Sequence, residues 1–304
     1  MTTQSSPGLK IWLMLLSLGV IWGASFMGSK MALTGFGPLT VAAGRISIGA
    51  VLLTAIAYTM GRRLPGFSSK TDRRIWLHCL GMAIASNALP FTLLSWGQLH
   101  VSSGFAGITM AVVPLLVLPL AHFLIPGDRM SRPKFIGFVI GFVGVIVLIG
   151  PAAFGNSGAE QENLARIACI ASACCYASGS IITRLCPPTP VMGFSAAALL
   201  LASLIMIPFA LFIEGAPALP DSTALAGILY LGIMPTAVAT VLLVQIINAA
   251  GPTFLVLVNY QVPIWAVIFG VLLLNETLPG QFIGALCLIL LGLAVSQAQR
   301  LRIR

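Results

Sequence analysis

Long uninterrupted apolar runs dominate this sequence and constrain its fold more than any other feature. Each run lasts roughly 20 residues, the length that crosses the ~30 Å hydrocarbon layer of a bilayer as a helix. The composition agrees, because 58% of the residues are hydrophobic and 8% are charged, whereas a soluble domain has about 25% charged residues. The runs are continuous rather than alternating, which favours helices over a transmembrane barrel. The sequence therefore predicts an all-α integral membrane protein.

Ten such spans can be delimited between charges, prolines and glycines. The connections between them are short, so they leave no room for a soluble catalytic or nucleotide-binding domain. The first span is longer than the 7–15-residue apolar core of a signal peptide and is expected to remain as a membrane helix. The predicted spans are Ile11–Leu33, Pro38–Met60, Ile75–Gly97, Val101–Ile125, Pro133–Gly150, Leu164–Cys186, Val191–Ile213, Thr223–Ile247, Pro252–Leu274 and Gln281–Ser296.

Positive charge is distributed unevenly over the connections. If the N-terminus is cytoplasmic, all of the 16 lysine and arginine residues except Lys30, Arg45 and Arg166 fall on the cytoplasmic side. The positive-inside rule counts only Lys and Arg, so it places both termini in the cytoplasm, as an even number of spans requires. The net charge of +9 is therefore interpreted as topology charge, and no nucleic-acid partner is expected.

The two halves of the sequence carry the same landmarks in the same order. Trp22 and Lys30 stand eight residues apart in the first span, and Tyr176 and Arg184 stand eight residues apart in the sixth. Five spans is an odd number, so the second copy must enter the membrane upside down. An inverted repeat with a solute site at the midplane is typical of secondary transporters. Two further pairs of landmarks are Pro114 with Pro263, and Phe135-Ile136-Gly137 with Phe282-Ile283-Gly284.

The repeat defines the expected organisation of the chain. Residues 1–150 form the first five-helix repeat, residues 163–298 form the second, inverted repeat, and residues 299–304 form a basic cytoplasmic tail. The expected partners are a small-molecule substrate and the lipid bilayer. No pattern in the sequence fixes an oligomeric state, and a monomer would suffice.

On these landmarks the chain resembles the EamA-type drug/metabolite transporter family over nearly its whole length. The resemblance implies ten helices, arranged as two inverted five-helix repeats around a central cavity. It also implies export of amino acids or other metabolites across a bacterial inner membrane. The chain departs from the family at Arg129, where an acidic residue is expected; Asp128 stands one place earlier. The residues that carry the resemblance are Trp22-Gly23, Arg45, Pro114, Pro263 and Glu276 before Gly284.

Several polar or aromatic side chains fall near the bilayer centre when the spans are counted at 1.5 Å per residue. Polar groups in hydrocarbon cost free energy unless they meet a partner or water, so a shared aqueous cavity explains them together. Interhelical hydrogen bonding is the alternative for each one alone. The Asn259-Tyr260-Gln261 cluster beside Pro263 is the sharpest candidate. The predicted solute-binding residues are Trp22, Asn87, Phe91, Met110, Tyr176, Asn259, Tyr260 and Gln261.

Prolines and two basic residues complete the candidate site. A proline inside a span removes a backbone hydrogen bond and can kink the helix, either to line a cavity or for packing alone. Lys30 and Arg184 each share a helix face with the aromatic residue eight positions earlier. We expect them at opposite mouths of the cavity, where they would attract a solute carboxylate; snorkelling to the lipid headgroups is the alternative. The four prolines are Pro90, Pro114, Pro235 and Pro263.

The sequence points to no cofactor, metal or enzyme chemistry. The six cysteines lie in apolar spans without paired spacing, which is typical of small core residues rather than of a metal site or a disulfide. The stretch from Gly23 to Lys30 imitates a phosphate-binding loop, but it lies inside an apolar helix instead of following a strand. A membrane-embedded enzyme would need a carboxylate pair, a histidine cluster or an activated nucleophile, and the sequence shows no such pattern.

These observations favour a secondary, ATP-independent transporter that exports small metabolites by alternating access, above all neutral or aromatic amino acids. Aromatic side chains would contact the apolar part of the solute, and Asn and Gln would bind its amine and carboxylate. The first alternative is a carrier of sugar phosphates or nucleotide sugars, which would need Lys or Arg deep in the cavity; only Lys30 and Arg184 are candidates, both near the mouths. A membrane-embedded enzyme or a structural subunit explains fewer of the observations.

Overall fold

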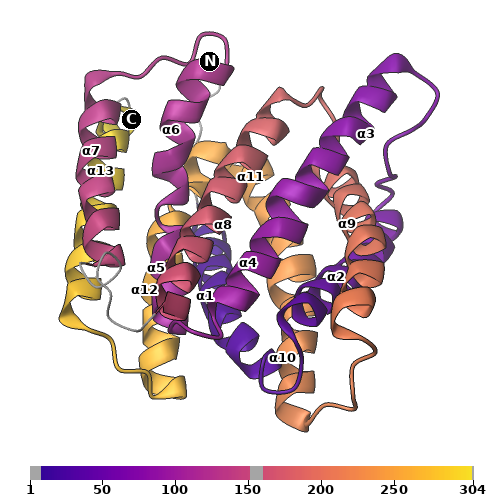
Figure 1. Ribbon diagram of the computed structural model, residues 1–304. Helices are drawn as coiled ribbons and strands as arrows, with labels where there is room; N and C mark the ends of the chain where they lie inside the picture. Colours follow the sequence, from indigo (N-terminus) through magenta and orange to yellow (C-terminus); the bar gives the residue numbers. More distant parts are fainter. Residues whose placement is uncertain (1–7, 151–159, 303–304) are drawn as a thin grey trace.

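The computed structural model of the protein describes residues 8–150 and 160–302, and every secondary-structure element in these ranges is a helix (Figure 1). Nine helices in this described part are long and apolar enough to cross a membrane, and a tenth apolar helix, Val258–Leu274, has 17 residues. The predicted all-α membrane fold is therefore confirmed. Of the predicted basic tail, residues 299–302 continue the last helix, and residues 303–304 lie outside the described residues.

Ten spans follow one another along the chain, and four of them are interrupted. Two spans contain a short π-helical segment, labelled η, in which backbone hydrogen bonds reach five residues back instead of four. The elements are α1 (Leu9–Ala32), α2 (Pro38–Thr59), α3 (Lys70–Met82), η1 (Ala83–Ala88), α4 (Leu89–Gly97), α5 (Ser103–Met110), α6 (Val113–Leu124), α7 (Arg132–Ile149), α8 (Glu160–Leu185), α9 (Val191–Glu214), α10 (Ser222–Gly232), η3 (Ile233–Val238), α11 (Ala239–Leu255), α12 (Val258–Leu274) and α13 (Gly280–Arg302).

Local capping and turn residues explain where the helix ends differ from the prediction. The third span begins at Lys70 rather than at Ile75, because Ser69 and Asp72 form a reciprocal capping box at its start. The sequence predicts the ninth span at Pro252–Leu274, but its continuous helix, α12, begins only at Val258. Gly251, with a φ of 82°, turns the chain before it, a conformation that glycine adopts without strain.

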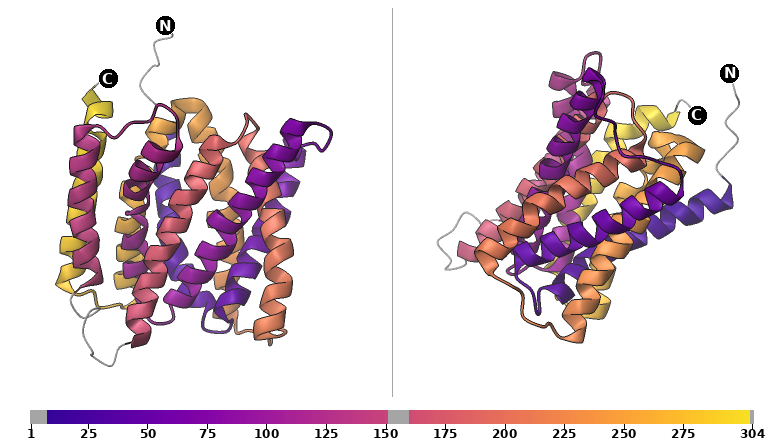
Figure 2. Two further views of the ribbon diagram at one scale, coloured as in Figure 1. Left: turned by 45° about the horizontal axis from the view of Figure 1, so that its top comes forward. Right: turned by 90° about the vertical axis from the view of Figure 1, so that its right-hand side faces the viewer.

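Helices of the first half pack against helices of the second half (Figures 1 and 2). α1 packs on α12, α2 on α9, and α7 on α13. The last pair is so close that a Cβ atom at Gly137 would collide with the carbonyl oxygen of Gly292, as expected for close packing through small residues. The contact of α4 with α8 is matched by that of α1 with α10. Two inverted copies would produce such matched helix–helix contacts. The inverted repeat itself stays a prediction.

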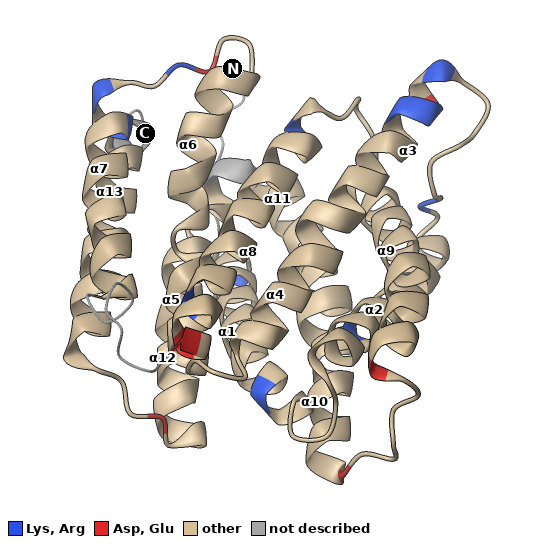
Figure 3. Cartoon of the chain, viewed as in Figure 1, with Lys and Arg blue, Asp and Glu red and all other residues tan. Residues whose placement is uncertain are grey.

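Charge separates the two ends of the bundle (Figure 3). The first turn of α1 and the last turn of α13 lie at the same end of the bundle, together with most of the Lys and Arg residues of the described chain. We call this end, which holds the starts of α3 and α7 and the last turn of α8, the basic end. Most of the Asp and Glu side chains lie at the opposite end, which holds the last turns of α9 and α12 and is called the acidic end.

Candidate functional site

Two π-helical segments interrupt the third and eighth spans near their middle. In η1 the side-chain amide of Asn87 donates to the carbonyl oxygen of Met82 at 3.0 Å. In η3 the hydroxyl of Thr236 donates to the carbonyl oxygen of Leu231 at 2.8 Å, which Pro235 cannot reach because proline has no N–H. Both polar side chains therefore satisfy the carbonyl five residues earlier, and the predicted solute-binding residue Asn87 is occupied within its own helix.

The fourth span is divided into α5 and α6 at Ala111 and Val112. The backbone N–H groups of these two residues bond three residues back, to Ile108 and Thr109, at 3.0 and 3.1 Å, and Pro114 follows in the first turn of α6. The division separates the packing partners of the two halves of the span. α5 packs on α12, whereas α6 packs on α7 and α8. In the ninth span the interruption falls at Val256–Leu257, before Pro263, which lies inside α12.

A cavity of about 250 Å³ is lined mainly by residues of α6, α8 and α13, together with Asn259 of α12. It extends from the loop between α6 and α7 at the basic end to residues near the middle of the fourth and ninth spans. Pockets for drug-sized ligands measure roughly 300–1,000 Å³, so this cavity suits a smaller solute. Among its lining residues are Pro114, Asp128, Lys134, Ser180, Arg184 and Asn259.

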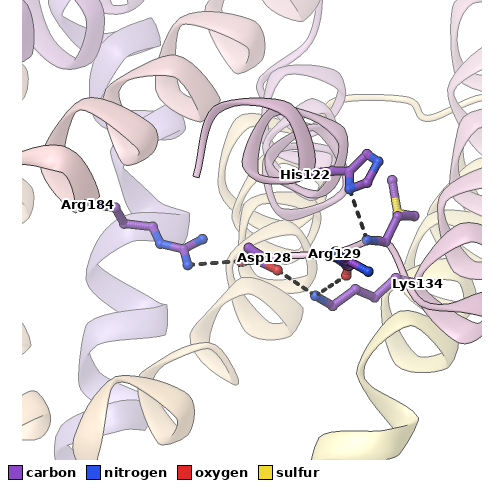
Figure 4. A network of polar contacts seen from close by, with 6 residues as sticks. His122, Asp128, Arg129, Lys134 and Arg184 are labelled. Carbon is purple, nitrogen blue, oxygen red and sulfur yellow. Dashed lines mark hydrogen bonds and ion pairs between the residues drawn. The ribbon is translucent and has the colours of Figure 1, made fainter. Parts of the chain in front are cut away.

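Asp128 organises the mouth of this cavity (Figure 4). Its carboxylate accepts hydrogen bonds from Lys134 Nζ at 2.8 Å and from Arg184 at 2.9 Å. The hydrogen bond from Lys134, reinforced by Arg184, holds the pKa of Asp128 below its ordinary value. Arg184 thus lies at a cavity mouth as the sequence predicts, but paired with an acid; its action on a solute stays a prediction. Lys30 lies half-buried in the last turn of α1, towards the acidic end.

Aromatic side chains and one arginine meet in the interior behind this cavity. The guanidinium carbon of Arg45 lies 3.8 Å from the centroid of the Phe91 ring, and Arg45 Nε donates to Thr236 Oγ1 at 3.3 Å. Phe91 in turn meets Tyr176 edge-on, with 6.3 Å between the ring centroids. The indole N–H of Trp22 donates to the carbonyl oxygen of the residue before Thr236, at 3.2 Å. Side chains from α1 and α2 therefore bind η3, and Phe91 of α4 connects Arg45 to Tyr176 of α8.

The three side chains of the predicted Asn259-Tyr260-Gln261 cluster do not all face the same surface. Asn259 lines the cavity and donates to the carbonyl oxygen of Val256 at 3.1 Å. Gln261 packs instead against α1, where a Cβ atom at Gly19 would lie 2.8 Å from its side-chain oxygen. Tyr260 is half-buried against the main hydrophobic cluster, as is Met110. Successive helical residues point about 100° apart, so these three neighbours cannot share one surface. Their roles as solute ligands stay predictions.

Two glutamates close the acidic end by binding the N-termini of neighbouring helices. Glu214, at the end of α9, accepts the backbone N–H groups of Leu39 and Thr40 at 2.9 and 2.8 Å. Glu276, after α12, accepts those of Ser103 and Gly104 at 2.7 and 3.2 Å. A carboxylate at a helix N-terminus is favourable for both the unsatisfied N–H groups and the helix dipole. We call these contacts the carboxylate latches; they join α9 to α2 and α12 to α5.

The sequence places Thr236 near the bilayer centre beside Pro235, but Arg45 was not predicted as a member of the interior group. From the sequence alone, Arg45 is counted among the charges of the outer half and as a landmark of the family resemblance. A local signal was present, because Arg45 stands seven residues inside α2, about 10 Å from its start at 1.5 Å per residue. An arginine that deep in an apolar span faces the bundle interior or a cavity far more often than lipid.

A bundle of membrane-length helices with a small cavity at one end is typical of a multi-pass membrane transporter. Comparison with known proteins gives the family. The profile of the EamA-like transporter family matches residues 9–150 and 163–297, and the chain belongs to this family. Members of the family are named transporters, so the protein is a transporter and not an enzyme.

Individual relatives are distant. The chain is 24% identical over 267 residues to the uncharacterized inner membrane transporter YedA of Escherichia coli (strain K12), covering 87% of this chain and 83% of YedA. It is 27% identical over 138 residues to a probable terminal-alkyne amino-acid exporter of Streptantibioticus cattleyicolor, covering 45% and 44% of the two chains. One crystal structure matches with a TM-score of 0.68 at 18% identity over 95% of this chain and 98% of the other, which establishes the fold.

Proposed function

We propose that the protein is a secondary transporter that exports small zwitterionic metabolites, above all neutral or aromatic amino acids. The observation that carries the proposal is a set of interior aromatic side chains, Phe91 against Tyr176 and Trp22 against η3, in a bundle that also holds a small cavity. Aromatic faces offer contact area to an apolar or aromatic side chain. The terminal-alkyne amino-acid exporter among the relatives supports the same class of solute.

The asymmetry of the bundle supports transport by alternating access. The carboxylate latches hold the acidic end together, while α6 stands apart from α12 at the basic end. In the export cycle the basic end would receive the solute, the latches would then open, and α6 would close onto α12. The π-helical segments and the break at Ala111–Val112 are the places where these helices can bend.

The proposed location is a bacterial inner membrane, with the basic end and both termini in the cytoplasm. The positive-inside rule supports this orientation, since Lys and Arg gather at the end that holds both termini. A reporter enzyme that is active only in the periplasm, fused after Arg304, should stay inactive. Strong reporter activity would reverse the orientation and with it the direction of export.

Transport is tested with the purified protein in liposomes. Vesicles loaded with unlabelled leucine, phenylalanine or tryptophan, without nucleotide, should accumulate the same labelled amino acid by exchange. Tyr176→Leu should reduce phenylalanine exchange about 5-fold or more, because an aromatic contact is lost. Tyr58→Leu, at an exposed tyrosine on the lipid-facing side of α2, is the matched control and should leave exchange unchanged. Exchange of glucose 6-phosphate but of none of the amino acids would overturn the proposal in favour of a sugar-phosphate carrier.

A further inference from the structure

We propose that Arg45 binds the carboxylate of the transported solute. This inference rests on the proposed function and assigns a residue that binds the charged end of the amino acid. Arg45 is a cation within a membrane span, where charge is costly unless it is paired or faces water. Its observed partners are the Phe91 ring and the hydroxyl of Thr236, and both of these groups are neutral.

All seven carboxylate side chains of the sequence lie in the described part of the chain, and those that bind a partner there bind groups other than Arg45. Asp128 pairs with Lys134 and Arg184, and Glu162 pairs with Arg166. The other acids that bind a partner in the described chain lie at helix N-termini: Asp72 caps α3, Asp221 caps α10, Glu214 binds the start of α2 and Glu276 binds the start of α5. Glu160 lies exposed in the first turn of α8. Within the described residues, Arg45 therefore has no acidic partner.

Arg166 differs from Arg45 because its guanidinium has an acidic partner in the described chain. The guanidinium of Arg166 binds both the Glu162 carboxylate and the carbonyl oxygen of Ile149. Arg45 uses one of its five N–H donors, Nε, on Thr236. Its two Nη groups make no hydrogen bond to any residue of the described chain. A guanidinium presents these groups as a planar fork that matches a carboxylate.

A path of side chains joins the cavity to this fork. Arg184 and Ser180 line the cavity, and Tyr176 lies one turn further along the same face of α8, about 6 Å deeper at 1.5 Å per residue. Tyr176 contacts both of the two large hydrophobic clusters, so it lies between them. Its ring meets Phe91, and Arg45 lies over Phe91. If the transport cycle opens the cavity beyond Ser180, a solute would meet the aromatic rings first and the guanidinium next.

This arrangement matches the chemistry of a neutral amino acid. The rings of Phe91 and Tyr176 would contact its apolar side chain, and Arg45 would neutralise its single negative charge. A phosphate dianion would need a second cation at the same place, and the described residues around Phe91 supply only Arg45. A merely structural role, in which Arg45 joins α2 to α4 and η3, makes a different prediction, because such a contact would be insensitive to the charge of the solute.

The test compares the binding of L-phenylalanine with that of L-phenylalaninamide, which lacks the carboxylate. Isothermal titration calorimetry on the full-length protein in detergent should give a dissociation constant about 10- to 100-fold lower for the acid, as expected for a hydrogen bond between charged groups. Arg45→Gln should weaken binding of the acid by that factor and leave binding of the amide unchanged. Arg45→Lys should keep part of the preference. The control Arg74→Gln removes an exposed arginine of α3 and should keep the full preference for the acid over the amide.

Each outcome decides between the claims. An unchanged preference for the acid in Arg45→Gln overturns the inference while leaving the proposed function intact. Equal binding of the acid and the amide by the unmodified protein also overturns the inference. This measurement does not depend on whether any variant folds. If the unmodified protein binds glucose 6-phosphate and no amino acid, the proposed function fails and the inference fails with it. If Arg45→Gln loses the preference for the acid while Arg74→Gln keeps it, the result supports both the proposed function and the inference.

Discussion

Three carboxylates that join separate elements, Glu214 and Glu276 at the acidic end and Asp128 at the basic end, bind different kinds of partner. At the acidic end, Glu214 and Glu276 accept hydrogen bonds from backbone N–H groups at the first turns of α2 and α5. At the basic end, Asp128 binds the side chains of Lys134 and Arg184. Backbone donors are fixed by the helix and are held without ordering a second long side chain. The flexible Lys and Arg chains must lose rotamer freedom to keep their places.

This difference agrees with where the helices have separated. Next to the Glu276 latch, α5 packs on α12, whereas towards Asp128 the cavity lies between α6 and α12. The rigid contacts therefore lie at the closed end and the adaptable contacts at the open end. In the proposed export cycle the latches break to release solute at the acidic end, so we expect their strength to set how much of the time that end is open.

Removing the charge of Glu276 should have the largest effect on this comparison. Glu276→Gln keeps the size of the side chain but weakens the hydrogen bonds from Ser103 and Gly104, each worth about 1.5–3 kcal/mol when the acceptor is charged. We expect hydrogen–deuterium exchange in the first turn of α5 to rise about 10-fold. Exchange in the first turn of α7, at the basic end, should stay the same.

The matched control for this variant is Glu160→Gln, which removes an exposed acid at the same end of the bundle. This variant should leave hydrogen–deuterium exchange in the first turn of α5 unchanged. If the two variants behave alike, the Glu276 contact does not hold the acidic end closed, and the contrast between fixed and adaptable contacts is lost.

The sequence predicts the spans well because hydropathy is a local property. Each of the ten predicted spans corresponds to a helix or a pair of helices, with ends shifted by caps such as Ser69 or turns such as Gly251. The interruptions were harder to place, since a proline only permits a break. Pro114 follows the break in its span by two residues, and Pro263 lies within a continuous helix.

The site could be predicted only in part, because the direction of a side chain depends on how its helix is rotated in the bundle. Asn259 and Gln261 are both polar and two residues apart, yet one lines the cavity and the other packs on α1. Arg45 is the reverse case, because it was not predicted as a site residue and yet belongs to the interior group. Its charge contributes to the topology count, and the packing of α2 against α4 and η3 places it over Phe91.

A smaller effect is expected from the two basic residues that sequence reasoning places at the mouths. Arg184→Gln should slow solute uptake from the basic side of oriented liposomes about 2- to 5-fold at low salt, because attraction near a mouth mainly accelerates encounter. The effect should vanish at high salt. Lys30→Gln is the matched variant at the other end, and it should slow uptake from the acidic side only. Equal effects of either variant from both sides would mean that these charges serve topology rather than encounter.

The smallest effect concerns the pH dependence of the Asp128 network. Because the pKa of Asp128 is held below its ordinary value, which is about 3.9 in an unfolded chain, the ionised carboxylate stabilises the fold fully above that pH. The contribution is lost only as the pH falls through the lower, folded-state value. Partly exposed ion pairs contribute about 0–1 kcal/mol each, so Asp128→Asn should lower the apparent melting temperature in detergent by only about 1–4 °C at pH 7. This difference between the unmodified protein and the variant should stay constant from pH 8 to about 5 and shrink below about 4. A difference that already disappears between pH 7 and 6 would mean that Asp128 is not held ionised by Lys134 and Arg184, and that the basic end is organised by some other contact.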